Sequence, residues 1–333
     1  MKSILEMVGR WWNGELGGAG DALDVITAPA EALYRGATNV RNALYDAGTL
    51  DRIALDVPVI SVGNVAVGGT GKTPVTAWLA RELRKAGRAP AVLHGGYADD
   101  EPALHREMNP SIPVHVGRDR VETGRAAIAA GANILVLDDA FQHRRLRRTL
   151  DIVLVAAETW NGRRRALPRG PWRESAAGLA RAEWIVVTRR TASLDEARSV
   201  RTQLRTRFPD ANVAIIHLAA RAWRHAGREA AAPTLAAHAL SAIASPDAFI
   251  ENARNAGATV DGVTFFPDHH EYDRTDVDNV LKRAGTAPIL TTAKDWVKLR
   301  HLLPADRVWV LMQHVEPEDD AEQLLQQARE LAR

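Results

Sequence analysis

The feature that most constrains the fold is a glycine-rich segment between a β-branched run and a helical pattern. The run over residues 57–62 predicts a buried strand, and the pattern over 72–85 predicts a helix. Glycines let successive backbone N–H groups converge on phosphate oxygens, and a helix that starts there adds the positive end of its dipole. The segment is therefore predicted to be a phosphate-binding loop that holds a nucleotide with Gly68, Gly69, Thr70, Gly71, Lys72 and Thr73.

Two side chains of this loop have specific expected roles. Lys72 is expected to reach the β- and γ-phosphates of ATP, and the Thr73 hydroxyl to ligate Mg²⁺. The usual motif begins with a glycine where this chain has Ala66. The alternative is a glycine-rich turn that contains Gly-Lys-Thr by chance. The strand before the segment and the helix after it favour the nucleotide site.

A second metal ligand is predicted at the end of another strand. The apolar run 134–137 ends in Asp138 and Asp139. The carboxyl end of a strand in a parallel sheet faces the ligand crevice, where a carboxylate can hold Mg²⁺ or its water shell. A strand can also end in Asp only to begin a turn, but the upstream phosphate loop favours the metal site. We therefore expect Thr73, Asp138 and Asp139 to hold the magnesium ion.

The alternation of apolar runs and helical patterns predicts an α/β fold with a mostly parallel sheet covered on both faces. After the phosphate loop, strands are expected at 89–93, 112–116, 133–137, 151–155, 184–188 and 213–217, and helices at 119–130, 173–182 and 194–208. A second set follows, with helices at 246–256, 274–284 and from 318, and strands at 259–265, 288–292 and 307–311. The Ala- and Arg-rich stretch 217–233 is the candidate boundary between domains 1–217 and 218–333.

Composition excludes several classes of function. The formal net charge of +2 argues against a dedicated nucleic-acid-binding protein. The absence of cysteine excludes disulfides, cysteine-ligated zinc and thiol nucleophiles. No stretch approaches the roughly 20 apolar residues of a membrane-spanning helix.

The N-terminal residues suggest a different kind of membrane contact. Apolar residues recur there at helical spacing and form one face of a predicted helix that ends in two tryptophans: Met1, Ile4, Leu5, Val8, Trp11 and Trp12. Tryptophan favours the headgroup zone of a bilayer, so this face could touch lipid. The alternative is that the face packs on the protein's own core.

Six motifs in order along the chain resemble those of the tetraacyldisaccharide 4′-kinases, the kinases of lipid A biosynthesis in Gram-negative bacteria. They are VPVISVGNVAVGGTGKTP, VGRDR, LDDAFQHRRLRRTLDIVL, NGRRRALPRGPWRE, FPDHH and TTAKDWVKL. The upstream segment LYRGATNVRNALYDAGTL also fits, so the resemblance covers most of the chain from about residue 33 to residue 300. The resemblance implies a P-loop NTPase-like parallel-sheet domain and a second, smaller Rossmann-like α/β domain that closes over the active site. That family also lacks the first glycine of the usual loop motif.

The resemblance also implies a reaction and a location. ATP would phosphorylate the 4′-hydroxyl of a tetraacyldisaccharide 1-phosphate to give lipid IVA. The protein would be peripheral, at the cytoplasmic face of the inner membrane, with the lipid-linked disaccharide and the inner-membrane surface as its partners. No nucleic acid and no obligate protein partner is expected.

Catalytic residues are carried over by motif. Beside Lys72, the family's catalytic base falls on Asp100 in Asp100-Glu101-Pro102, and the histidine that supports it falls on His269. A carboxylate oriented by a histidine can accept the proton of a sugar hydroxyl, which is worth about 10²–10⁴-fold in rate. Asp99 is a rival for the base, and a capping or core role is the alternative for His269.

The segment 144–173 is rich in arginine: Arg144, Arg145, Arg147, Arg148, Arg163, Arg164, Arg165, Arg169 and Arg173. This density suits a substrate phosphate and anionic headgroups. The alternative for most of these arginines is a solvated basic face.

Some positions depart from the family pattern. The segment before Asp100 is shortened, and Ala293 stands where the family has glutamate. These departures leave two alternatives to a fully active kinase: a divergent copy with weak activity or a different acceptor, and a non-catalytic scaffold. A third alternative is a P-loop NTPase switch or chaperone, although the sequence has neither a guanine-specificity Asn-Lys-x-Asp motif nor a second lysine in the loop.

Overall fold

The computed structural model describes residues 2–96, 100–243, 246–268 and 270–331. Contacts divide the chain into two compact units. Unit 1 comprises Met1–Gly96, Ser111–His217 and Pro317–Arg333, and unit 2 comprises Tyr97–Pro110 and Leu218–Glu316. The division at 217/218 coincides with the sequence-based boundary, whereas the segments 97–110 and 317–333 lie in the other unit from the one that the sequence suggested.

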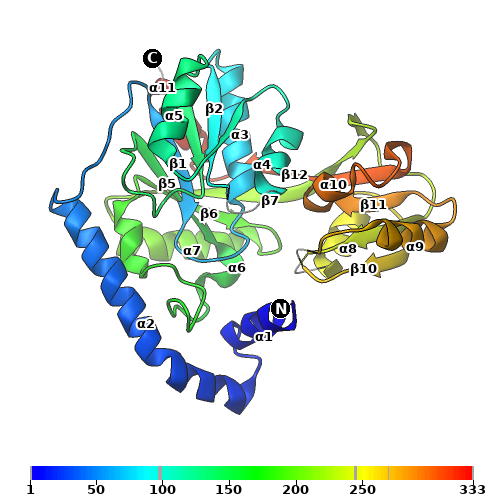
Figure 1. Ribbon diagram of the computed structural model, residues 1–333, viewed down its shortest axis with the longest axis horizontal. Coiled ribbons are helices and arrows are strands. Elements are labelled where there is room, and N and C mark those ends of the chain that lie inside the picture. The colour runs from blue at the N-terminus through cyan, green and yellow to red at the C-terminus, as the bar shows by residue number, and fades with distance from the viewer. Residues whose placement is uncertain (1, 97–99, 244–245, 269, 332–333) are drawn as a thin grey trace. The chain divides into compact units, whose positions relative to one another are not determined.

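Unit 1 contains a parallel sheet with the strand order β7-β6-β5-β1-β4-β2-β3 (Figure 1). Neighbouring strands from β3 to β7 pair in parallel. Every residue of β1, β4 and β5 is buried, as a sheet covered on both faces requires. The predicted α/β class with a phosphate-binding-loop sheet is thereby confirmed. The strands are β1 (Val59–Asn64), β2 (Pro90–His94), β3 (Val114–Val116), β4 (Ile134–Asp138), β5 (Leu150–Ala156), β6 (Trp184–Arg189) and β7 (Asn212–His225).

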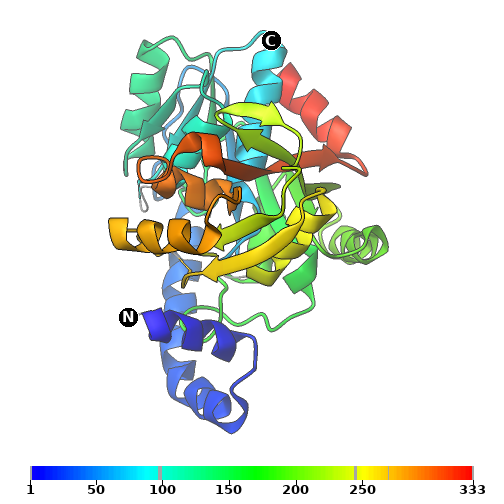
Figure 2. The same ribbon diagram turned by 90° about the vertical axis from the view of Figure 1, so that its right-hand side faces the viewer.

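Helices cover this sheet, and the apolar side chains on one side of each helix pack against those of the buried strands. The helices are α3 (Lys72–Lys85), α5 (Arg120–Ala129), α6 (Ala157–Trp160), α7 (Leu194–Arg207) and α11 (Ala321–Glu330). One apolar cluster joins α7 to β5 and β6, and another joins α5 to β1, β2 and β4. The C-terminal helix α11 packs against α3, and the two lie side by side in Figure 2.

One expected helix is wrong. Residues 173–182 form only a short 3₁₀ helix, η1 (Ala176–Arg181). The Arg173 carbonyl accepts from the Tyr34 hydroxyl (2.9 Å) instead of from a helical N–H, and Ser175 has an extended backbone (φ −67°, ψ +156°). Gly178 further weakens an α-helix there, and a Cβ on it would lie 2.5 Å from the Glu174 carboxylate.

Unit 2 has the strand order β10-β9-β11-β12-β7. Its strands are β9 (Ala237–Ser241), β10 (Val260–Phe265), β11 (Ile289–Thr292) and β12 (Val308–Pro317), and β8 (Arg228–Ala230) pairs antiparallel with the distal part of β7. Its helices are α4 (Asp100–Met108), α8 (Pro246–Asn255), α9 (Arg274–Ala284) and α10 (Ala293–Leu299), with a 3₁₀ turn η2 (Ala305–Arg307). The pairs β9–β10, β9–β11 and β11–β12 are parallel. The stretch 217–233, the candidate boundary, is mostly strand, because β7 continues to His225 and β8 follows.

Two helices precede β1: α1 (Lys2–Trp12) and α2 (Gly17–Asp46). Trp11 is buried, and its indole N–H donates to the Gly20 carbonyl and to Asp24, each at 3.1 Å. The expectation that Trp11 touches lipid is therefore wrong, because this side chain fastens α1 to α2. Within the described part of the chain, no helix combines the length and the apolar character needed to cross a bilayer.

Candidate active site

The phosphate loop has the backbone that its glycines predict. It follows the carboxyl end of β1 and leads into α3, with Gly71 as the residue before the helix. Gly68 and Gly71 have φ values of +117° and +87°, a region that side chains with a Cβ rarely adopt. The loop therefore depends on glycine at these two positions, and Lys72 opens the helix with its N–H groups facing the loop.

Buried hydroxyl and amide groups fix the middle of the loop. The side-chain amide of Asn64 donates to the Thr70 hydroxyl (2.9 Å), and the Thr188 hydroxyl donates to the Thr70 carbonyl (2.9 Å). Asn64 and Thr188 are fully buried, and they come from the ends of β1 and β6. Sequence reasoning missed both of them. The one available signal was that each stands at the carboxyl end of a predicted buried strand.

A close approach of backbones brings the acidic turn to the loop. A Cβ on Gly63, in β1, would lie 2.6 Å from the Cβ and 2.7 Å from the backbone nitrogen of Phe141. Only glycine therefore lets β1 pack against the turn that follows β4. Asp138 is the last residue of β4, and Asp139 begins that turn.

Asp139 is the acid that faces the loop lysine. Its carboxylate lies 3.6 Å from the Lys72 Nζ and 2.6 Å from a guanidinium nitrogen of Arg173. Asp139 has a left-handed backbone (φ +51°), which turns the chain just past the strand end. The three side chains form a partly exposed group of two cations and one anion. This group has the net positive charge that a phosphate requires.

Asp138 is more deeply placed. It is fully buried, and its carboxylate accepts a hydrogen bond of 3.3 Å from Thr76 on α3. Thr73, which is half-buried, lies one turn before Thr76 on the same helix. In the described ranges, no group of three or more His, Cys, Asp or Glu side chains could hold a metal by itself. The donors present are hard oxygens, as Mg²⁺ prefers, and phosphate oxygens commonly complete such a shell.

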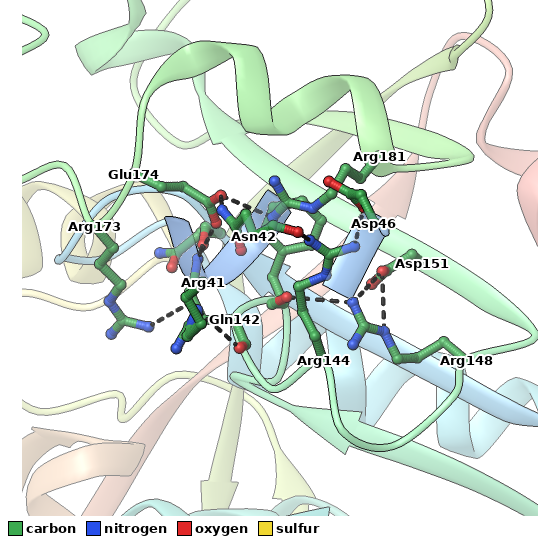
Figure 3. Close-up of polar contacts among 12 residues, drawn as sticks. Arg41, Asn42, Asp46, Gln142, Arg144, Arg148, Asp151, Arg173, Glu174 and Arg181 are labelled. Atoms are coloured by element: carbon green, nitrogen blue, oxygen red, sulfur yellow. Dashed lines mark hydrogen bonds and ion pairs between the residues drawn. The ribbon is translucent and has the colours of Figure 1, made fainter. Parts of the chain in front are cut away.

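A polar cluster continues from Arg173 (Figure 3). The Gln142 amide donates to Glu174 (2.8 Å) and to the Asn64 carbonyl (2.8 Å). The buried Glu174 also accepts from Arg181 (2.8 Å), and Asn42 of α2 reaches it at 3.4 Å. Glu174 thus connects Asn42 of α2 with Gln142, and Gln142 in turn donates to the last residue of β1, the strand before the phosphate loop. The sequence placed Gln142 and Glu174 in motifs but could not assign them a role.

Most of the arginines in segment 144–173 are neither free for a ligand nor simply solvated, because they form ion pairs. Arg144 pairs with Asp46, Arg145 with Asp119 and Arg148 with Asp151. Arg163, Arg165 and Arg169 surround the buried Asp24, and Arg169 also pairs with Glu31. Arg173 is the member of the segment that pairs with an acid of the phosphate-loop group.

A cavity of about 370 Å³ lies among several of these arginines, including Arg52, Arg147 and Arg148. It is at the amino ends of β5 and β6, the opposite edge of the sheet from the phosphate loop. Burial raises the pKa of Asp151 in its wall, and Arg148 opposes that shift. The cavity is thus separate from the nucleotide site.

His143, next to the acidic turn, is held neutral. Burial lowers its pKa to about 4, and the nearby guanidinium groups of Arg120 and Arg148 act in the same direction. A neutral imidazole adds no charge beside the arginines that surround it.

The two remaining predicted catalytic residues are Asp100 and His269. Asp100 lies in unit 2, in the first turn of α4, beside Glu101. His269 lies outside the described residues; its neighbour His270 stacks on Phe266 and pairs with Asp276 (2.6 Å).

Comparison with known proteins decides the family. The family model described as tetraacyldisaccharide-1-P 4′-kinase matches residues 23–99 and 98–330. The chain belongs to the tetraacyldisaccharide 4′-kinase family. The family indicated by the motifs is thereby confirmed.

Individual members of the tetraacyldisaccharide 4′-kinase family are similar in sequence to this chain over most of their length. The enzyme of that name from Anaeromyxobacter dehalogenans is 37% identical over 326 residues, covering 89% of this chain and 86% of its own. That of Halorhodospira halophila is 38% identical over 300 residues, covering 84% and 85%. A crystal structure of LpxK from Aquifex aeolicus in complex with ATP matches with a TM-score of 0.79 and 27% identity, covering 93% of this chain and 100% of that one. These matches do not favour a switch or chaperone.

Proposed function

We propose that this protein transfers the γ-phosphoryl group of ATP to the 4′-hydroxyl of a tetraacyldisaccharide 1-phosphate, giving lipid IVA and ADP. The observation that carries the proposal is the phosphate loop with Lys72, Asp139 and Arg173 drawn together beside it, in a chain that matches these kinases over most of its length. Phosphoryl transfer depends mainly on positioning and on neutralising phosphate charge, and this group of charges is suited to both.

The magnesium ion belongs to this proposal. Thr73, Asp138 and Asp139 would hold it, since they supply oxygen donors at the loop and at the neighbouring strand end. The ion would neutralise charge on the β- and γ-phosphates. Lys72 and Arg173, the two cations that pair with Asp139, would then be available to the phosphate oxygens.

Deprotonation of the acceptor is assigned to Asp100. Its carboxylate would take the proton of the 4′-hydroxyl as the oxygen–phosphorus bond forms and the bond from the γ-phosphorus to the ADP oxygen breaks. His269 would orient Asp100. These roles rest on the family motifs, with Asp100 at the start of a helix, where the dipole favours a carboxylate.

Membrane attachment is assigned to α2. This helix buries Asp24 and Glu31 against unit 1 and exposes Val25, Ile26 and Leu33, each more than 70% accessible. Val40, further along, is also exposed. Asp21, Arg35, Arg41 and Asp46 are exposed as well, but a surface helix that buries two acids and exposes an aliphatic stripe departs from the usual pattern. A lipid surface at the cytoplasmic face of the inner membrane would cover such a stripe.

The transfer reaction tests the proposed function directly. Purified protein is incubated with Mg-ATP and the tetraacyldisaccharide 1-phosphate in detergent micelles, and phosphate on the glycan is measured. We expect transfer by the wild type and at least about a 100-fold loss in Lys72→Ala, because the lysine's charge on the transferred phosphate is removed. Hydrolysis of ATP at the same rate without the lipid would contradict the proposal, and so would absence of both reactions.

A further inference from the structure

Arg190 touches the phosphate loop, and no predicted role accounts for it. It directly follows β6, whose carboxyl end lies at the same edge of the sheet as the loop. Its guanidinium donates to the carbonyl of Gly69, three residues before Lys72. Its two terminal nitrogens lie 3.5 and 3.8 Å from the point where a Cβ on Gly69 would stand. Arg190 therefore lies directly over Gly69.

The end of β6 contacts two consecutive loop carbonyls in different ways. Thr188 is fully buried and donates to the Thr70 carbonyl (2.9 Å). Arg190, two residues on, donates to the Gly69 carbonyl from a side chain that is only partly buried, above an exposed stretch of the loop. Thr188 thus stabilises the loop from inside the protein, whereas the Arg190 side chain is accessible to a ligand bound at the loop.

The backbone that carries Arg190 is fixed in advance. The Glu158 carboxylate, in the first turn of α6, accepts from the N–H groups of Arg190 (2.6 Å), Thr191 (3.1 Å) and Ala192 (3.2 Å). Burial raises the pKa of Glu158, but these N–H groups outweigh burial and the net shift is downward. An arginine on such a support loses little freedom when a ligand binds, which favours affinity.

The strand order indicates which part of the nucleotide Arg190 meets. The loop strand β1 lies between β4 and β5, and β6 lies beyond β5. The acids that face Lys72 follow β4, so the terminal phosphates belong on that side. A triphosphate held by the loop then runs toward β5 and β6 with its nucleoside end. Arg190 is on that side.

We propose that Arg190 is a nucleoside-contacting residue whose guanidinium plane stacks on the adenine ring of ATP. A guanidinium stacks on aromatic faces by dispersion and by cation–π attraction, and it can do so while its edge keeps the hydrogen bond to Gly69. The proposal rests on the use of ATP in the proposed function and adds the residue that holds its base.

The test compares two ligands that differ in the nucleoside. Binding of MgADP and of magnesium tripolyphosphate to the full-length protein is measured by calorimetry for the wild type, Arg190→Ala and Arg190→Lys. We expect Arg190→Ala to weaken MgADP by about tenfold and to leave tripolyphosphate within about twofold of the wild type. Arg190→Lys, which keeps the charge without the plane, should fall between them for MgADP. Arg125→Ala, at an exposed position on α5, is the matched control and should bind both ligands as the wild type does.

Two binding results overturn the assignment. Equal weakening of both ligands would make Arg190 a phosphate contact or a brace of the loop, and no change in either would remove it from the site. Melting temperatures of the variants identify a folding defect. If Arg190→Ala has one, the binding of the two ligands to Arg190→Lys tests the assignment instead. A wild type that binds MgADP but transfers no phosphoryl group would refute the proposed function and leave this inference standing.

Discussion

At the scale of single residues, Gly63 and His143 have properties that only the folded chain reveals. Gly63 lets the turn that begins with Asp139 approach β1, and His143 remains neutral among arginines. Neither role could be seen in the sequence, because both depend on what a distant segment brings near.

Gly63→Ala should destabilise the protein. The added methyl group would overlap the backbone and Cβ of Phe141, so β1 and the turn must separate, at a cost of about 1–3 kcal/mol. Chemical denaturation measures this free energy. Gly36→Ala is the control, since nothing lies within 4 Å of its added Cβ, and it should be neutral or slightly stabilising. Equal stability of the two variants would show that the close approach at Gly63 is not tight.

His143 makes stability depend on pH in a defined direction. Its pKa falls from the ordinary 6.5 to about 4 in the folded protein, so the unfolded chain binds the proton more tightly. Stability is therefore full above pH 6.5 and falls as the pH drops toward 4, by less than about 1.4 kcal/mol per pH unit because the ring is partly solvated.

Denaturation of the wild type and His143→Gln between pH 4 and 7.5 measures this effect. The wild type should lose stability more steeply than the variant in that window. His301→Gln controls for loss of a histidine at an exposed position. Parallel curves for the wild type and His143→Gln would contradict the lowered pKa.

At the scale of elements, a strand or helix was predicted correctly where its own residues show the apolar spacing of that element. The runs that became β1, β4, β5 and β6 are apolar and short, and the glycines of the loop announce a turn between strand and helix. The predicted helix at 173–182 failed because the Arg173 carbonyl accepts from Tyr34 of α2 and Ser175 is extended, contacts that no local pattern encodes. The helix α4 was not predicted, although Asp100 and Glu101 place acidic side chains in its first turn, because at nine residues it is too short to show a clear apolar period.

The sequence did not predict the exposed aliphatic stripe of the helix α2. Leu33→Asp places a charge in its exposed aliphatic stripe without removing any internal contact. We expect this substitution to reduce binding to vesicles of anionic phospholipid by several-fold in flotation assays, with unchanged melting temperature. Asn39→Asp adds the same charge at an exposed α2 position and is the matched control. Equal binding by both variants would show that the stripe does not meet lipid.

At the scale of the whole molecule, the sequence indicated an α/β class and a change of unit near residue 217, but not that each unit is assembled from separate segments. The segment with Asp100 leaves unit 1 and belongs to unit 2, and the last residues return to unit 1. Such returns depend on contacts between distant parts of the chain, and no local pattern encodes them.

Ligand binding should report on the whole folded chain. A nucleotide that binds only the folded state stabilises it by about 2.7 kcal/mol at 100 times its dissociation constant. We expect Mg-ATP to raise the melting temperature by several degrees, EDTA to remove most of that rise, and Lys72→Ala to show little of it. A rise that EDTA leaves intact would contradict a role for the metal in binding.

The packing of α11 on α3 has a consequence for how this chain can be shortened. Arg329 pairs with Glu82 of α3 (3.2 Å), and Gln327 accepts from the Trp184 indole of β6 (2.6 Å). A protein cut at residue 217 would keep every residue of the phosphate loop but would uncover the helix that begins at Lys72. The final turns of the polypeptide are therefore part of the support of the nucleotide site, and a polypeptide released from synthesis before they emerge would lack it.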